Sequence, residues 1–188
     1  MYFVSYKAQT TPVVFTPDMQ YSLLRVPFNC KTRTFGEKVD TLYNAPEQGG
    51  SVSYPRISAD GKYLLYTLSD YGTFPIWHDE ADLRMMDLTT MKDVDVSIWN
   101  DDATADSFHN WSSNGRWAVF GSRRVDGRYT RLMIAYMDKD GKPHKPFLLP
   151  QEDPRHNTWR LRSYNVPEFI KDKVSLPKEA EKIFCPEN

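Results

Sequence analysis

The chain has 188 residues, the size of one domain or of two very small ones, which argues against a large multidomain enzyme. Hydrophobic residues make up 40% of it and aromatic residues 14%, so we expect a folded core and not a disordered chain. The 24 Lys and Arg residues almost balance the 25 Asp and Glu residues, giving a net charge of −1. This balance argues against binding to nucleic acid or to anionic lipid.

No apolar run reaches the roughly 18 residues that a membrane-spanning helix needs, and the first residues lack the basic and apolar regions of a signal peptide. We therefore expect a soluble chain with no transmembrane segment and no signal peptide. The two cysteines, Cys30 and Cys185, lie near opposite ends, so neither a disulfide framework nor a cysteine-based zinc site is expected. Two free thiols are the simpler expectation, and a single disulfide between the ends is the alternative.

The first 45 residues contain three segments with the β-branched and aromatic composition of strands. These segments are residues 1–6, 21–28 and 37–43. They are interpreted as the second, third and fourth strands of a four-stranded unit whose first strand is missing. The glycines within residues 48–51 then mark the connection to the next unit.

Two later segments repeat each other without a gap. Residues 54–66 read YPRISADGKYLLY, and residues 108–120 read FHNWSSNGRWAVF. In each segment, strand-forming residues flank an Asp-Gly or Asn-Gly pair, at residues 60–61 and 114–115. Because Gly and Asn adopt positive φ at low cost, each pair predicts a hairpin with a tight two-residue turn.

A third and a fourth strand are predicted after each hairpin. In the first repeat they lie at residues 82–88 and 95–99, and in the second at residues 131–137 and 145–149. Pro146 is compatible only with an outer strand that has an unpaired edge.

Units of this length and strand count are typical of propeller blades. The sequence therefore predicts an all-β fold, a partial β-propeller of about three four-stranded antiparallel blades with an irregular C-terminal tail. The blades are predicted at about residues 1–47, 48–106 and 107–150, and the tail at residues 151–188. Within the tail, residues 178–184 are compatible with a short helix.

The pattern Ser-x-(Asp/Asn)-Gly-(Lys/Arg)-aromatic occurs at residues 58–63 and 112–117. It resembles the Pro-Asp-Gly-Lys blade signature of TolB-like β-propellers, a WD-like repeat of cell-envelope proteins. Residues 63–78, followed by residues 81–83, are similar to a Bacteroidetes branch of that family. The resemblance covers about residues 1–150 and implies a place in the periplasm or cell envelope.

The same resemblance implies about six blades and an export signal in intact relatives. A propeller removes its open sheet edges by closing a ring of at least four blades, and three blades should not close. We therefore expect either a fragment of a longer protein or a homodimer in which two chains cover each other's open edges.

Propeller topology places the loops between the second and third strands of every blade on one face. These loops are residues 8–20, 69–81 and 121–130, and they combine aromatic and arginine side chains suited to a peptide, a glycan or a carboxylate. The candidate ligand-binding residues are Tyr71, Trp77, His78, Arg123, Arg124 and Arg128. The alternative is that residues 74–77 only pack over their blade and that the arginines are solvated.

The leading functional hypothesis is a non-catalytic binding module that docks a protein or peptide partner on this face. No catalytic residue is assigned, because no G-x-S-x-G elbow follows the blades. The histidines show no metal-site spacing, including His78 in its His-Asp-Glu run, so no metal and no cofactor are expected. A carbohydrate-active or hydrolytic propeller and a remnant without its own ligand are the alternatives, because a propeller fold alone does not decide function.

Overall fold

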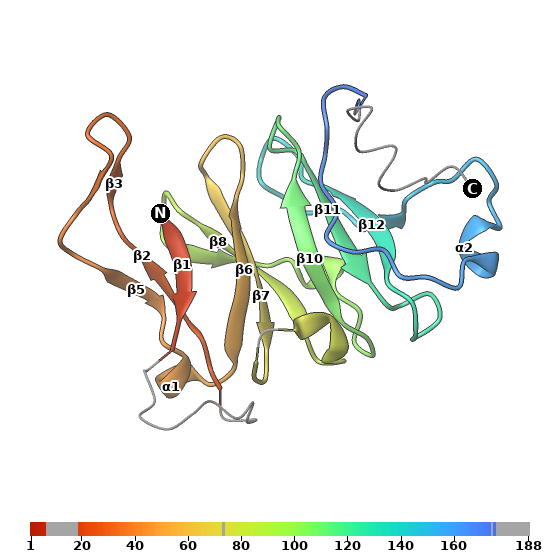
Figure 1. Cartoon of the computed structure of the whole chain (residues 1–188), viewed down its shortest axis with the longest axis horizontal. Helices are drawn as coiled ribbons and strands as arrows, with labels where there is room; N and C mark the ends of the chain where they lie inside the picture. The colour runs from red at the N-terminus through yellow and green to blue at the C-terminus, as the bar shows by residue number, and fades with distance from the viewer. Residues whose placement is uncertain (7–18, 73, 174, 176–188) are drawn as a thin grey trace, which may run out of the picture.

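The computed structural model describes residues 1–6, 19–72, 74–173 and 175. Within them the chain has the predicted all-β fold, in which three antiparallel sheets stand side by side as the blades of a partial propeller (Figure 1). The expected helix at residues 178–184, Cys185 and nearly all of the first predicted loop lie outside these residues.

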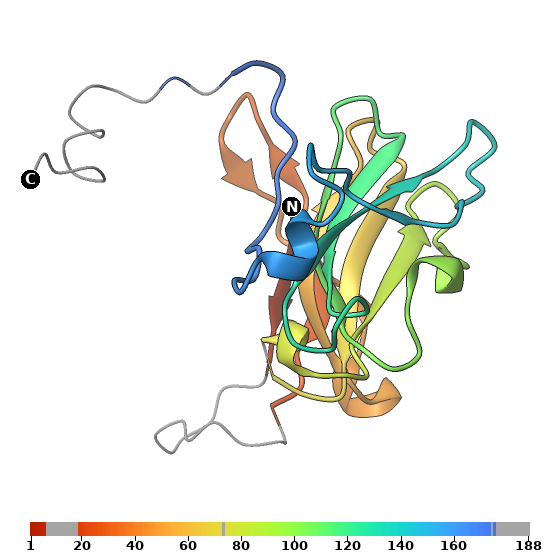
Figure 2. The same ribbon diagram turned by 90° about the vertical axis from the view of Figure 1, so that its right-hand side faces the viewer.

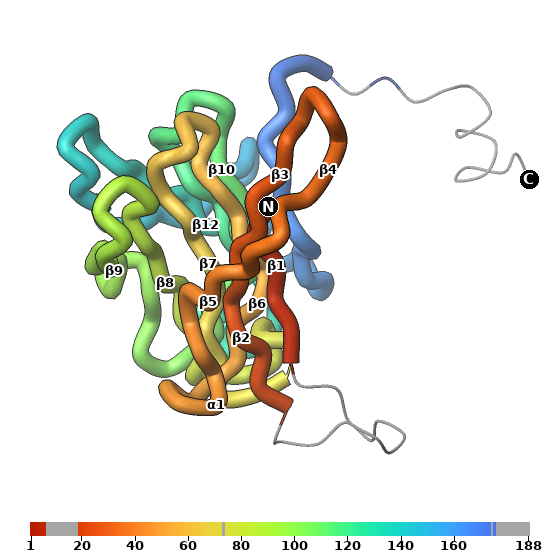
Figure 3. The backbone as a smooth tube through the Cα atoms, turned by 90° about the vertical axis from the view of Figure 1, so that its left-hand side faces the viewer, coloured from red at the N-terminus to blue at the C-terminus, as the bar shows by residue number. Residues whose placement is uncertain are grey.

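The first blade has three strands, β1 (Tyr2–Ser5), β2 (Ser22–Arg25) and β5 (Asp40–Tyr43), in the order β1-β2-β5. Between β2 and β5 the chain adds a hairpin that sequence reasoning missed, formed by β3 (Phe28–Asn29) and β4 (Thr34–Phe35). This hairpin rises at the same end of the molecule as the turn between the first two strands of the second blade (Figure 3). Cys30 lies exposed within it.

The second blade follows the short helix α1 (Ala45–Gln48) and has four strands, β6 (Ser51–Ile57), β7 (Tyr63–Ser69), β8 (Asp82–Asp87) and β9 (Lys92–Val94). The third blade repeats this order with β10 (Asp106–Trp111), β11 (Trp117–Ser122), β12 (Arg131–Tyr136) and β13 (Phe147–Leu148). Pro146 lies directly before the outer strand β13, where its missing N–H removes no bond from the sheet interior.

The hairpin turns are longer than the two-residue turns predicted from the Asp-Gly and Asn-Gly pairs. In the second blade, Ser58 Oγ donates to Asp60 Oδ1 (2.7 Å) and accepts from the Tyr63 N–H (3.0 Å). Asp60 Oδ1 also accepts from the Lys62 N–H (3.1 Å), and the Gly61 N–H closes a β-turn onto Ser58 O (2.9 Å). Each pair therefore belongs to a five-residue loop whose polar groups satisfy one another.

The third blade repeats every one of these bonds at the matching residues. Ser112 Oγ donates to Asn114 Oδ1 (2.7 Å) and accepts from the Trp117 N–H (3.0 Å), and Asn114 Oδ1 accepts from the Arg116 N–H (3.0 Å). Gly61 and Gly115 have φ of 75° and 66°, a region that glycine adopts without steric cost. The repeated pattern Ser-x-(Asp/Asn)-Gly therefore specifies this loop.

The predicted fourth strand of the second blade at residues 95–99 is wrong. The outer strand is β9, and the chain leaves the sheet after Val94 to form a 3-10 turn, η2 (Ser97–Trp99). Trp99 is fully buried and its Nε1–H donates to His144 O of the third blade (3.0 Å). Because the Trp99 side chain turns toward the neighbouring blade, residues 97–99 do not continue the outer strand at the sheet edge.

The side chain of Asn100 occupies the sheet position that the outer strand vacates. Its Oδ1 accepts from the Leu83 N–H (2.9 Å) and its Nδ2 donates to Leu83 O (3.0 Å). One amide therefore makes the two bonds that a fourth strand would have made to β8 at this position.

Two apolar clusters hold the blades together. The first lies between blades one and two and contains Leu23, Val52, Leu64, Tyr66 and Met86. The second lies between blades two and three, and its buried members are Leu65, Leu83, Met85, Val96, Trp99, Trp111, Ala118, Phe120, Met133, Ala135 and Met137. Each blade junction is therefore a hydrophobic sheet-on-sheet contact.

The segment after the third blade packs against that blade through Arg131. It contains the short helix α2 (His156–Trp159) and runs beside the third blade (Figure 2). The fully buried Arg131 guanidinium donates to the carbonyl oxygens of Asn157, Arg160 and Arg162 and pairs with Asp126 (3.1 Å). One charged side chain thus anchors the irregular segment to the start of β12.

Candidate functional site

The loops between the second and third strands of blades two and three contact each other. The loop of blade two carries a 3-10 turn, η1 (Pro75–Trp77). Arg123, in the loop of blade three, donates through Nη1 to Asp79 Oδ1 (3.2 Å) and through Nη2 to Gly127 O (2.5 Å). Propeller topology predicted that these two loops lie together on one face, and the contact between Arg123 and Asp79 agrees with that prediction.

Trp77 and Arg123 form a stacked pair at the surface. The guanidinium carbon of Arg123 lies 5.3 Å from the centroid of the Trp77 ring, a cation–π geometry. Trp77 is 70% exposed, whereas the Arg123 side chain is only 15% exposed. Asp79 and Gly127 fix the arginine in place, and the arginine contacts an indole ring that faces solvent.

A second group lies in the same loop of blade two. The Tyr71 ring packs edge to face on His78 with centroids 4.4 Å apart, and His78 Nδ1 lies 3.2 Å from Glu80 Oε1. Burial raises the pKa of Glu80, but the N–H groups of Glu80 and Asp70 together with His78 outweigh it and lower the pKa below its usual value. The Gly72 N–H donates to Met19 O (2.7 Å), which ties this loop to the end of the first predicted loop.

The structure uses the six candidate residues in different ways. Tyr71 packs with His78 and Trp77 with Arg123, as described above, and Arg128 is exposed on the same loop as Arg123. Arg124 turns inward instead, and donates through Nη2 to Asp106 Oδ1 (2.7 Å) and to Trp99 O (2.6 Å).

The Arg124–Asp106 pair supports the core. Asp106 is fully buried and also accepts from the Asp101 N–H (2.7 Å). Burial outweighs the attraction of Arg124 and raises the pKa of Asp106 to about 6. Sequence reasoning did not assign Asp79 or Asp106 as the partner of an arginine, because only the folded chain shows which acid lies beside which arginine.

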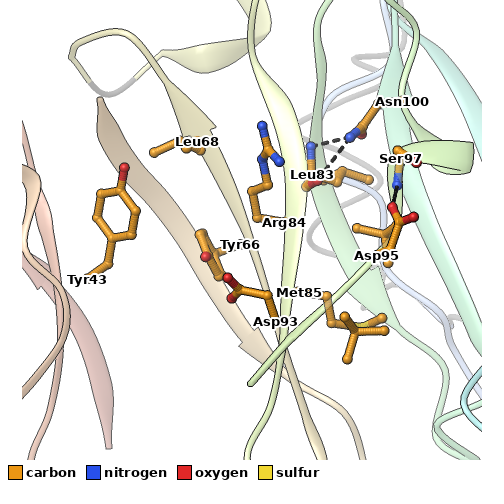
Figure 4. Close-up of a pocket in the computed structure, with 12 residues that line it drawn as sticks. Tyr43, Tyr66, Leu68, Leu83, Arg84, Met85, Asp93, Asp95, Ser97 and Asn100 are labelled. Atoms are coloured by element: carbon orange, nitrogen blue, oxygen red, sulfur yellow. Dashed lines mark hydrogen bonds between the residues drawn. The ribbon is translucent and has the colours of Figure 1, made fainter. Parts of the chain in front are cut away.

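A separate groove of about 510 Å³ opens at the outer side of blade two (Figure 4). Tyr43 of β5 faces it from blade one, and Tyr66, Arg84 and Asp93 line it from three strands of blade two. Burial raises the pKa of the Tyr66 phenol further above its ordinary value. Sequence reasoning missed the groove, since its residues come from four strands and share no motif.

Two further properties concern only the described parts of the chain. Residues 1–6, 19–72, 74–173 and 175 contain no group of three or more His, Cys, Asp or Glu side chains arranged to hold a metal ion. In the same residues, no helix has the length and apolarity that crossing a membrane requires.

Comparison with known proteins identifies no family. No family model and no curated protein matches the chain. Two solved structures of acylaminoacyl peptidase from Pyrococcus horikoshii, an orthorhombic crystal form and an uncomplexed form, are similar to it at 15% sequence identity and a TM-score of 0.36. Each match covers 70% of this chain and 23% of the peptidase chain, so the chain spans less than a quarter of that protein. A likeness at this level does not identify an activity.

Proposed function

We propose that the chain is a non-catalytic binding module that docks a protein or peptide on the loop face, defined here by Tyr71, Phe74, Trp77, His78 and Arg123. The observation that carries this proposal is the exposed Trp77 ring supported by Arg123. A large aromatic side chain that stays in water exposes apolar area without any gain to folding. Trp, Tyr and Arg are also the residues that contribute most to protein interfaces.

The loop face is organised before a ligand arrives. Arg123 is fixed by Asp79 and Gly127, and Tyr71 is fixed against His78. Because these side chains are already ordered, binding would cost little of the conformational entropy that weakens flexible interfaces. Trp77, 70% exposed, and Phe74, 60% exposed, would provide the apolar contact area.

Exposed Arg128, on the same loop as Arg123, would suit a ligand with an acidic group next to its apolar anchor. The cation of Arg123 is paired with Asp79, whereas Arg128 is exposed on the same loop. A carboxylate beside an aromatic or aliphatic side chain would reach Arg128 while the apolar group contacts Trp77. Peptides that combine Glu or Asp with Leu, Phe or Trp meet this requirement.

Glycoside hydrolysis is one rival function, and it would require two carboxylates facing a sugar. Of the three acids in the blade-two loop, Asp79 pairs with Arg123 and Glu80 with His78, which leaves Asp70 without a second free carboxylate in that loop. This pairing is why binding is preferred to chemistry on the loop face. The resemblance to TolB-like propellers supports a location in the periplasm or cell envelope.

Selection from a random peptide library displayed on phage tests the proposal. Selected peptides are resynthesised, and their affinity for the wild-type chain is measured by calorimetry. We expect Trp77→Ala to weaken binding at least about tenfold, or about 1.4 kcal/mol. Trp159→Ala is the matched control, because Trp159 is equally exposed at 70% but belongs to α2.

Two results would overturn the proposal. One is a library that yields no peptide with a Kd below about 1 mM, the weak end of specific binding. The other is a set of peptides that bind Trp77→Ala as tightly as the wild-type chain.

A further inference from the structure

Each blade presents the same three positions toward the blade that follows it. Two of these positions lie on the second strand, two residues apart. The third lies on the third strand and pairs with the later of the two. In chain order the three sets are Tyr2, Val4 and Leu23; Tyr63, Leu65 and Met85; Trp117, Val119 and Ile134. All three sets are apolar or aromatic, so the third blade carries the same kind of face as the first two.

In the first two blades these positions form the blade junctions. Tyr2, Val4 and Leu23 pack in the cluster between blades one and two, and Leu65 and Met85 are buried between blades two and three. Among the described residues, no fourth sheet covers the equivalent face of the third blade. Val119 on that face is nevertheless buried and Trp117 and Ile134 are half-buried, so the face has the composition of a junction but is open only in part.

An aromatic cluster marks the end of this face where the second strand begins. The Trp117 ring lies 4.8 Å from Tyr136 and 6.5 Å from Phe147, and Phe147 is 45% exposed. Arg131 anchors the following segment at the other end of these strands, because Arg131 pairs with Ser122 whereas Tyr136 pairs with Trp117, and the segment then rises along the blade (Figure 1). The aromatic end of the face is thus remote from the Arg131 anchor.

Both existing junctions show which part of the following blade covers this end. In each, the loop between the third and fourth strands of the following blade reaches the start of the second strand of the preceding blade. At the second junction Gly141 lies so close to the Tyr63 hydroxyl that a β-carbon on Gly141 would overlap it. At the first junction Met91 lies 3.9 Å from Arg25, the residue paired with Tyr2.

The corresponding loop of the first blade is the β3–β4 hairpin, which has two exposed aromatic residues of its own. Phe28 and Phe35 are 43% and 57% exposed, and their rings lie 5.0 Å apart. The first blade also presents half-buried Phe3 and Leu24 on the side facing away from blade two. The first and the third blade therefore each have an apolar surface at an end of the row, and the two surfaces correspond to the two sides of a blade junction.

We propose that the aromatic end of this face, at Trp117 and Phe147, docks the first blade of a second copy of this chain, with the β3–β4 hairpin of that copy covering Trp117. The contact continues the two junctions already present within the chain. It is heterologous, since one copy contributes its third blade and the other its first blade. Two copies close into a ring if the rotation permits, and otherwise the copies form an open row.

Solution mass measured by light scattering during size exclusion, from about 1 to about 100 µM, tests the proposal, because self-association depends on concentration. We expect the wild-type mass to exceed the 21.9 kDa of one chain. Trp117→Glu and Phe35→Glu should each weaken association at least about tenfold. Ile98→Glu is the matched control, because Ile98 is 48% exposed on η2 and faces neither junction surface.

Mixing the two defective variants identifies the head-to-tail geometry. A Trp117→Glu chain keeps an unchanged β3–β4 hairpin, and a Phe35→Glu chain keeps an unchanged third blade. The first can therefore dock on the second but not the reverse, so an equimolar mixture should form a one-to-one pair that grows no further. Circular dichroism checks that Trp117→Glu folds. Phe147→Glu, at an exposed position on the same face, provides a second variant if it does not.

Three outcomes would overturn the proposal. The first is a wild-type chain that stays monomeric over the whole concentration range. The second is a Phe35→Glu chain that associates like the wild type, which would indicate that two third blades stack on each other. The third is a mixture of the two variants that stays monomeric. None of these results depends on whether the loop face binds a peptide.

Discussion

Tyr54 and Phe108 occupy the same position in successive blades, share a φ of 53°, and contact each other edge to face with ring centroids 5.3 Å apart. Each lies where its strand bulges, between Ser53 and Arg56 in β6 and between Ser107 and Asn110 in β10. A left-handed conformation costs a non-glycine residue on the order of 1 kcal/mol or more. Both blades keep a residue with this strained backbone at the bulge. The two rings meet at the junction between blades two and three.

The left-handed φ of Tyr54 should reverse the usual order of two substitutions. Tyr54→Gly and Tyr54→Ala lose the same ring contacts, but only glycine is free of strain at this φ. We expect Tyr54→Gly to be more stable than Tyr54→Ala by about 1 kcal/mol in urea unfolding. At Tyr63, which has no positive φ, alanine should be the more stable of the two. Alanine being better at both positions would contradict the account of the bulge.

The hairpin loops predict which residues replace Asp60. The third blade has Asn114 at this position with the same hydrogen bonds, so Asp60→Asn should change the free energy of unfolding little. Asp60→Ala removes the acceptor for Ser58 and for the Lys62 N–H and should cost about 1 to 2 kcal/mol. Thermal unfolding of both variants checks this. An equal loss for both would mean that charge, and not the acceptor oxygen, stabilises the loop.

Asn100 should be hard to replace, because its amide satisfies both the N–H and the C=O of Leu83. Asn100→Ala leaves two backbone groups without these partners and should destabilise the chain by about 2 to 3 kcal/mol. Asn100→Asp keeps the acceptor but places a carboxylate oxygen against the carbonyl of Leu83. Hydrogen exchange at the Leu83 amide should accelerate in Asn100→Ala and less so in Asn100→Asp. Unchanged protection in both variants would show that the side chain does not replace the strand.

His109 should make stability depend on pH. It is fully buried, lies 3.0 Å from Leu65 O through Nε2, and burial lowers its pKa from 6.5 to about 4. Between these values the unfolded chain takes up a proton that the folded chain does not, so His109 destabilises the fold as the pH falls. The loss is on the order of 3 kcal/mol at most.

Asp106 changes the stability of the fold in the opposite direction over nearly the same pH range. Burial raises its pKa from 3.8 to about 6, so the folded chain gains the proton first and becomes more stable as the pH falls from about 6 toward 4. The two effects partly cancel in the wild-type chain. Urea unfolding between pH 4 and pH 6.5 should show stability rising with acidification in His109→Gln and falling in Asp106→Asn. Parallel profiles for both variants and the wild type would refute the assignment.

The hairpins of blades two and three could be predicted because their information is local. The motif Ser-x-(Asp/Asn)-Gly encodes its own loop, and the flanking apolar residues encode the strands. The strand at residues 95–99 was wrong because Val96 and Trp99 are buried three residues apart, a spacing that suits the turn η2 and not a strand.

The candidate site was predicted only as far as topology reaches. Propeller order brought the loops of Trp77 and Arg123 together. It gave no means to decide between Arg123 and Arg124, because that choice depends on buried Asp106, 18 positions earlier. The anchoring role of Arg131 was equally hidden, since an arginine at the start of a strand is ordinarily exposed.

The self-contained hairpin loops have a consequence for the order of folding. Their hydrogen bonds join residues at most five positions apart, whereas the junction bond from Trp111 Nε1 to Arg56 O joins residues 55 positions apart. Local contacts form before distant ones because they close shorter stretches of chain. We therefore expect each hairpin to gain its turn early and the blades to dock onto one another in a later and slower step.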